Sequence, residues 1–298
     1  MCRIVCLGMA VRDLVFEVPA LPAVPQKLTA SAMHLRGGGM AATAAVAAAA
    51  LGARVEYWGR LGDDEIGREL RRDLQSRGVQ VEALTVPDTR TPVAAVLVAG
   101  NGERMLAVYR GNLDDSADWL PLDRLAAAQA VLADFRWVEG AKSLYLAAAG
   151  RRIARVLDAD VGDPAALHAL LPLVDHAIFS QQGLADLAGS SDVEQGLRKA
   201  AAETAGVVAA TMGERGSMFV VDGTVHHIPA PVVEARDSNG AGDVFHGAYT
   251  FVLSLGRTVI DAARFASAAA ALKCRNGGGW EAVPDRAAVN DFLKGSKC

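Results

Sequence analysis

The chain has 298 residues, of which 51% are hydrophobic and 21% are charged, and its formal net charge is −4. This length and apolar content allow one large domain with a sizeable buried core. A weakly acidic chain has no electrostatic reason to bind nucleic acid or an anionic membrane, so we expect neither as a partner.

The apolar runs and the cysteines favour a cytoplasmic protein. The longest apolar stretches are short or amphipathic, so no membrane span is expected. Residues 3–9 read as a first strand with no targeting segment before them. The four cysteines, which lack metal-ligand spacing and are expected to be reduced thiols, are Cys2, Cys6, Cys274 and Cys298.

Short apolar strands alternate with Ala- and Leu-rich helices along most of the chain. We predict strands at residues 3–9, 54–60, 130–135, 155–159, 175–180 and 206–212. We predict helices at residues 40–51, 65–77, 139–149, 165–172 and 193–205, and another that follows residue 243 and runs through Leu255. The helix at 65–77 is expected to be capped by Asp63 or Asp64. This alternation predicts an α/β fold, a doubly wound, mostly parallel sheet with helices on both faces.

Two regions interrupt the alternation. Residues 13–36 and 86–110 read as extended segments without an intervening helix. We expect them to form a small β lid over the site, inserted into a single α/β domain that spans residues 1–298. An exposed lid sheet has open strand edges, so we also expect a homodimer through the lid.

Three consecutive glycines precede the first predicted helix. Read from Gly37 to Ala42, this stretch imitates the G-x-G-x-x-A fingerprint of dinucleotide-binding proteins. That fingerprint directly follows the first strand of its fold, whereas about thirty residues separate Gly8 from Gly39 here. The dinucleotide interpretation is therefore disfavoured.

Residues 237–243 read Asp-Ser-Asn-Gly-Ala-Gly-Asp and run into an apolar helix. Small residues at 240–242 let main-chain amides point at one spot at the positive end of that helix, which suits an anion. Asp243 stands beside this spot as a proton acceptor. An anion cradle next to a carboxylate is what phosphoryl transfer to an alcohol requires. The alternative is a glycine-rich helix start with acidic residues around its first turn.

This segment resembles the D-T-x-G-A-G-D signature of the PfkB (ribokinase-like) carbohydrate kinases, with Ser238 where Thr is usual. The resemblance extends over nearly the whole chain. It implies a ribokinase-like fold and an ATP-dependent sugar kinase that uses Mg²⁺. It also implies that Asp243 is the catalytic base and that the amides of Gly240, Ala241 and Gly242 form the anion hole.

The resemblance implies further site residues. Those implied to bind the sugar are Asp13, Gly38, Gly39 and Thr43, where Asn is common at the last position. Those implied to bind the nucleotide are Thr211, Gly213, Gly216 and Asp237. Asp237 is also expected near the metal. In some members of the family a monovalent cation such as K⁺ binds near residues 266–279.

One departure from the family concerns the metal. Many members carry N-x-x-E at a strand end near the middle of the chain, and here Ser180 and Gly183 stand at those places. Asp158 and Asp160 are candidates for outer-sphere metal ligands. The alternative is that this pair only caps the turn after its strand.

The substrate is expected to contact basic residues at its far end, and the candidates are Lys27, Arg104, Arg110 and Arg136. Arg136 follows a buried strand, where its fork of donors suits a phosphate, sulfonate or carboxylate. Residues 37–46 and 131–137 resemble one branch of the family, the 6-deoxy-6-sulfofructose kinases. This resemblance implies that Lys27 and Arg136 hold the sulfonate. An Asn of that branch falls at Val108 here, which leaves a phosphorylated or neutral ketose open.

The sequence leaves other functions open. The enzyme alternatives within the superfamily are fructokinase or ketohexokinase, ribokinase and nucleoside kinase. The non-enzyme alternative is a sugar or nucleotide sensor on the same fold, which the departure from N-x-x-E raises.

Overall fold

The computed structural model describes residues 1–100 and 103–295. Residues 101–102, inside the expected lid segment 86–110, and residues 296–298, which include Cys298, lie outside the described part.

The larger sheet has nine strands in the order β13-β12-β11-β10-β9-β8-β1-β4-β5. These are β1 (Arg3–Gly8), β4 (Arg54–Gly62), β5 (Val79–Val86), β8 (Ala130–Asp134), β9 (Ala154–Ala159), β10 (His176–Ser180), β11 (Val207–Thr211), β12 (Ser217–Val221) and β13 (Thr224–Ile228). Neighbours from β11 to β5 pair in parallel, and β12 and β13 pair antiparallel.

Helices cover both faces of this sheet because its central strands are apolar on both sides. In β1, Ile4 and Cys6 belong to one core, whereas Val5 and Leu7 belong to the other. The first core contains residues of α1 (Met40–Ala50), α2 (Glu65–Ser76), α7 (Ala241–Ser254), α8 (Val259–Asn276) and α9 (Arg286–Gly295). The second contains residues of α3 (Val138–Ala148), α4 (Pro164–Leu170), α5 (Gln181–Ala188) and α6 (Val193–Ala200). The predicted α/β fold class is confirmed.

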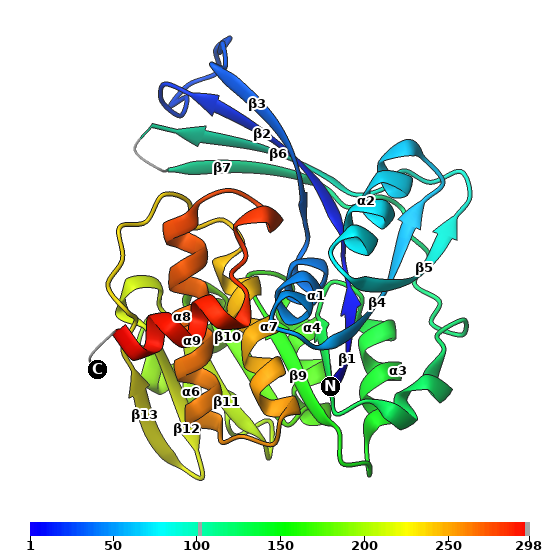
Figure 1. Ribbon diagram of the computed structural model, residues 1–298, viewed down its shortest axis with the longest axis vertical. Coiled ribbons are helices and arrows are strands. Elements are labelled where there is room, and N and C mark those ends of the chain that lie inside the picture. The colour runs from blue at the N-terminus through cyan, green and yellow to red at the C-terminus, as the bar shows by residue number, and fades with distance from the viewer. Residues whose placement is uncertain (101–102, 296–298) are drawn as a thin grey trace.

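A second sheet lies beside this body, at the top of Figure 1. Its strand order is β3-β2-β6-β7, with β2 (Val11–Val18), β3 (Ala32–Gly38), β6 (Val93–Ala99) and β7 (Arg104–Tyr109). Asp13 of β2 stands opposite both Arg36 and Ala94, and Ala94 stands opposite Val108. These four residues therefore form one row across the lid.

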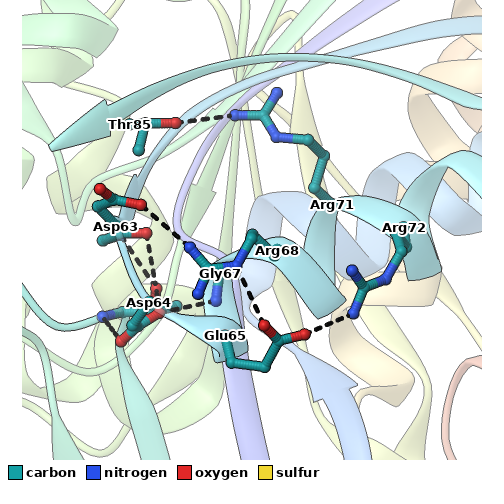
Figure 2. Close-up of polar contacts among 10 residues, drawn as sticks. Asp63, Asp64, Glu65, Gly67, Arg68, Arg71, Arg72 and Thr85 are labelled. Carbon is teal, nitrogen blue, oxygen red and sulfur yellow. Dashed lines mark hydrogen bonds and ion pairs between the residues drawn. The ribbon is translucent and has the colours of Figure 1, made fainter.

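The start of α2 is tied to the lid. Asp64 caps the helix, because its Oδ1 accepts a hydrogen bond from the amide of Gly67 at 2.8 Å. The same carboxylate accepts the hydroxyl of Thr91 at 2.6 Å and its amide at 2.9 Å, just before β6 begins. Figure 2 shows Asp64 turned toward Gly67, with Glu65 reaching Arg72 on the outer side of the helix. The predicted cap is confirmed at Asp64.

Several elements differ from the sequence prediction. The prediction from the apolar pattern omits α5, α8, α9, β5, β12 and β13, and its helix at 193–205 extends beyond Ala200, where α6 ends. Helix α5 has only eight residues, which is too short to carry a clear apolar period. A two-residue turn joins β12 to β13, and its Asp222 and Gly223 both have positive φ, as a tight hairpin requires.

Two observations concern the cysteines and membrane insertion. Cys2 and Cys6 are buried and Cys274 is half-buried, each as a free thiol. Within residues 1–100 and 103–295, no helix combines the length and apolar character needed to cross a bilayer.

Candidate active site

Two cavities lie at the carboxyl ends of the parallel strands, where open parallel sheets bind their ligands. The first, of about 340 Å³, is bounded by the lid and the body. The second, of about 800 Å³, is bounded by α7, α8 and the turn after β11. Thr211, at the end of β11, and Gly242, in the first turn of α7, line both cavities. The arrangement suits two ligands that meet at α7.

Most of the predicted site residues line these cavities. Those on the first cavity are Asp13, Gly38, Gly39, Thr43, Arg136, Asp160, Thr211, Gly240, Gly242 and Asp243. Those on the second are Thr211, Gly213, Gly216, Ala241 and Gly242. Of the predicted residues, Lys27, Arg104 and Asp237 are the ones that line neither cavity. Lys27 is exposed in the segment between β2 and β3, so the structure does not bring it to the site.

The N-terminus of α7 forms an anion cradle. Gly240 precedes the helix with φ 72°, a left-handed conformation that favours glycine, and no side chain caps the helix there. Within the described residues, the amides of Gly240 and Gly242 donate no hydrogen bond, while that of Ala241 donates to the main-chain oxygen of Ser238 at 3.2 Å. Unpaired amides at the positive end of a helix bind anions well.

Asp243 lies in the first turn of α7, next to this cradle, and lines the first cavity. Burial raises the pKa of Asp243 well above its usual range, and the charge of Asp158 raises it further, while His246 acts in the opposite direction. A carboxylate with a raised pKa is a stronger base once it is ionised. The position therefore suits a group that accepts a proton from a ligand in the first cavity.

His246 connects α7 to the sheet. Its Nδ1 lies 2.7 Å from the main-chain oxygen of Gly242, and its Nε2 lies 3.1 Å from that of Ile178. Burial lowers the pKa of His246, whereas the two carbonyl acceptors raise it. Its Nδ1 is also 3.4 Å from Oδ2 of Asp158. The imidazole thus holds the first turn of α7 against β10.

Asp158 and Asp160 provide the features that fit a divalent metal ion. Both line the first cavity, and Oδ2 of Asp158 is buried without a hydrogen-bond partner among the described residues. Burial raises the pKa of Asp158 well above its usual range, followed by the charge of Asp160. No group of three or more His, Cys, Asp or Glu side chains in the described chain is placed to hold a metal. A Mg²⁺ ion would therefore take most of its ligands from phosphates and water.

The expected metal role of Asp237 has no support in this geometry. Asp237 lines neither cavity, and its Oδ2 lies 2.8 Å from Nη1 of Arg36. A guanidinium at this distance already compensates the carboxylate.

The opposite wall of the first cavity carries Asp13. A Cβ atom at Gly38 would lie 2.6 Å from Oδ2 of Asp13, so only glycine leaves room for this carboxylate. Burial raises the pKa of Asp13 to about 6, while a hydrogen bond from Asn239 and the charge of Arg36 act against the shift. Nearby, Oγ1 of Thr43 accepts a hydrogen bond from the indole of Trp280 at 2.9 Å.

Two arginines line the same cavity. Arg136 and Arg110 both line it, and within the described residues neither forms an ion pair with a carboxylate. Burial lowers the pKa of Arg136, and the positive charge of Arg110 lowers it further. The main-chain amide of Arg136 donates to buried Asp134 at 2.9 Å, which orients the residue. The charges of Asp134, Asp160 and Asp158 act in the opposite direction on Arg136, so its charge is partly compensated. Two cations without a direct ion pair beside a cavity still favour an anionic ligand.

The sequence prediction missed four residues of this region, and they are Arg36, Asp134, Lys273 and Trp280. Lys273 had a usable signal, because it directly follows the apolar stretch 268–272 of one helix. Arg36 and Trp280 had none, since their contacts join segments far apart in the chain.

The fold and the site geometry together indicate the protein family. A sequence model described as the pfkB family carbohydrate kinases matches residues 1–286, so the chain belongs to this family. It is 28% identical to a ribokinase of Haemophilus influenzae over 97% of both chains. It is also 28% identical to a fructokinase of Vibrio alginolyticus, over 86% of this chain and 91% of that one. A solved structure from Agrobacterium tumefaciens, provisionally assigned as a ribokinase, matches with a TM-score of 0.94 at 30% identity, over 99% of this chain and 98% of that one. The family resemblance is confirmed.

Proposed function

We propose that the protein is an ATP-dependent kinase that phosphorylates a primary hydroxyl of a ketose-type sugar. One observation carries this proposal: the two cavities meet at Gly242, directly before the carboxylate of Asp243. A sugar in the first cavity and ATP in the second would bring an alcohol and a γ-phosphoryl group to one base. A ribokinase of Arabidopsis thaliana, solved with ribose and ATP, has the same fold with a TM-score of 0.82.

In this proposal Asp243 accepts the proton of the attacking hydroxyl. Its raised pKa supports the role, because a base works best when its pKa approaches the working pH. The amides of Gly240 and Gly242 donate to the transferring phosphoryl group, assisted by the positive end of α7. The lid excludes water from the first cavity.

The nucleotide is assigned to the second cavity. Thr211, Gly213 and Gly216 form its wall at the end of β11, opposite the start of α7. Mg²⁺, when bound, neutralises charge on the phosphates. Asp158 and Asp160 are the residues that would hold it, since both line the first cavity and Oδ2 of Asp158 has no hydrogen-bond partner among the described residues.

The sugar is assigned to the first cavity. Asp13 would accept hydrogen bonds from two adjacent hydroxyls, with Gly38 and Gly39 leaving room for the ring and Thr43 adding a hydroxyl. Arg136, with Arg110, would hold an anionic group at the far end. We therefore favour 6-deoxy-6-sulfofructose or a phosphorylated ketose as substrate. A role for Lys27 would require the segment between β2 and β3 to close over this end.

A neutral substrate is the second candidate. Val108 contributes an apolar side chain, 49% exposed, to the lid side of the cavity where the sulfofructose branch has a polar one. This favours fructokinase, ketohexokinase or ribokinase activity on a neutral sugar. A nucleoside kinase and a non-catalytic sensor are the remaining alternatives.

An ADP-release assay tests the proposal. The panel contains sulfofructose, fructose 6-phosphate, fructose, ribose and adenosine, each with ATP and Mg²⁺. We expect the anionic ketoses to react fastest and Arg136→Met to raise their KM by about 10- to 100-fold while leaving the KM of fructose unchanged.

The variant Asp243→Asn tests the catalytic base separately from sugar binding. It should lower kcat by about 10²- to 10⁴-fold, with sugar binding measured by calorimetry largely retained. Near-normal turnover of Asp243→Asn would refute the role of Asp243 as the catalytic base. If the wild type binds a sugar without phosphorylating it, the protein is a sensor.

Three further predictions accompany this function. The cytoplasm stays the predicted location, consistent with the free thiols of the described cysteines. A dimer through the lid is predicted from its open edges. The third, a monovalent cation such as K⁺, rests on the family resemblance alone, and the contacts of Asp237 with Arg36 and Lys273 argue against it.

A further inference from the structure

Lys273, near the C-terminal end of α8, is buried, with 2% of its surface exposed. Its ammonium group donates to the main-chain oxygen of Asp237 at 3.1 Å and lies 3.9 Å from Oδ1 of the same residue. A buried ammonium group requires oxygen atoms that replace its water. In this chain Asp237 supplies them.

The remaining oxygen of Asp237 is also occupied. Its Oδ2 lies 2.8 Å from Nη1 of Arg36, and its Oδ1 accepts the amide of Asn239 at 2.8 Å. The carbonyl and both carboxylate oxygens therefore contact donors of the protein itself. A bound metal ion would place a third positive charge beside one carboxylate and displace a bonded donor. The monovalent cation expected near residues 266–279 does not fit here.

The contact joins α8 to the segment that builds the anion cradle. The amides of Arg236 and Asp237 donate to the main-chain oxygen of Cys274 at 2.9 and 3.2 Å, one residue beyond Lys273. The chain then runs from Asp237 to Gly240, which directly precedes α7. A cation at Asp237 thus acts on the shape of the cradle.

We propose that the ammonium group of Lys273 is a built-in monovalent cation that holds the Asp237 segment in place, so that the enzyme requires no K⁺. An alkylammonium head group resembles a potassium ion in charge and size, and both bind carbonyl and carboxylate oxygens. Tethering the cation to α8 removes its dependence on concentration. The test of this proposal measures the reaction rate, which rests on the proposed kinase function, and the melting temperature, which does not.

The test compares the wild type with Lys273→Met, in buffer whose monovalent cation is tetramethylammonium, before and after addition of KCl. For the wild type we expect K⁺ at about 100 mM to change the rate by less than about twofold and to leave the melting temperature unchanged. Lys273→Met should melt about 5 °C or more below the wild type, because Asp237 loses a buried partner. K⁺ or NH₄⁺ should restore much of its rate and raise its melting temperature.

Lys294→Met is the matched control, since it removes a lysine of α9 whose side chain is 76% exposed and should leave both readouts unchanged. Stimulation of the wild type by K⁺ of about tenfold or more would overturn the proposal. A folded Lys273→Met whose rate and melting temperature both ignore K⁺ would do the same. If that variant does not fold, the wild-type titration decides. If no sugar is turned over, the proposed function fails, while the melting temperatures still decide the role of Lys273.

Discussion

Carboxylates in this molecule differ in basicity because their immediate contacts differ. Asp64 is held by Thr91 and Gly67, whose hydrogen bonds lower its pKa although burial acts the other way. Asp13 and Asp243 face a cavity, and burial raises the pKa of each. The hydrogen bonds to Asp64 stabilise the start of a helix, whereas the carboxylates of Asp13 and Asp243 remain available to a ligand.

Asp13 allows a prediction for stability and pH. The pKa is about 6 in the folded chain against 3.8 as the ordinary value, so ionising Asp13 costs folding free energy. The cost is fully present above pH 6 and absent below pH 3.8. Asp13→Asn should therefore raise the free energy of unfolding at pH 8 by about 1–3 kcal/mol and leave it unchanged near pH 4. Urea unfolding at both pH values measures this, and equal stabilisation at both would contradict it. The KM for sugar should rise at the same time.

At the scale of elements, the end of β3 and the start of α1 act as one unit. Gly38 closes β3 where Asp13 of β2 approaches, and Gly39 leads into α1. A Cβ at Gly38 would meet the carboxylate of Asp13 at under 3 Å. The glycine therefore serves the neighbouring strand, because it gives the side chain of Asp13 its position.

Gly38→Ala should push the carboxylate of Asp13 away from the cavity. We expect the KM for sugar to rise by about tenfold or more while the KM for ATP stays within about twofold, as for loss of a charge-assisted hydrogen bond. Steady-state kinetics with each substrate varied in turn measures the split. Gly295→Ala in α9, where an added Cβ meets nothing within 4 Å, is the control. An equal change in both KM values would argue for a general loss of structure.

At the scale of the whole molecule, both faces of the lid carry apolar side chains, and the inner face lines the first cavity. Its inner face carries a small core of Val11, Val15, Ala94 and Val96 and the row with Asp13. Its outer face is apolar too, with Leu14 opposite Leu35 and Phe16 opposite Met33. Leu35 and Met33 are 57% and 53% exposed, which is unusual for a sheet face that stays in water. The lid also contacts the body, since Arg104 donates to Asn239 at 3.1 Å beside the anion cradle.

We predict that the outer face of the lid packs on the lid of a second copy. Sedimentation equilibrium should then give a dimer, and Leu35→Glu should shift it toward monomer because a charge would be buried in the interface. Leu146→Glu, on α3 at 61% exposure, should leave the dimer intact. A wild type that stays monomeric over the whole concentration range would rule out this interface.

Part of the site was predictable because it is local. Gly240, Gly242 and Asp243 sit within one turn of the start of α7, so their neighbourhood follows from helix geometry. The strand pattern likewise predicts the α/β fold, since each central strand shows its apolar character along its own length. The short helix α5 and the antiparallel edge β12–β13 escaped prediction, because the pattern of a few residues is ambiguous.

The tertiary structure determined the contacts between segments that lie far apart in the chain. Arg36 meets Asp237 across 201 positions of sequence, and Lys273 meets it across 36. Those contacts pair Asp237, which was expected near the metal, with two cations of the protein itself. The amino-acid sequence by itself determined the class of fold and the cradle with its carboxylate, because both depend on neighbouring residues. Which cations face Asp237, and which arginines line the cavity, depends on strand order and register, and these follow from packing the whole chain.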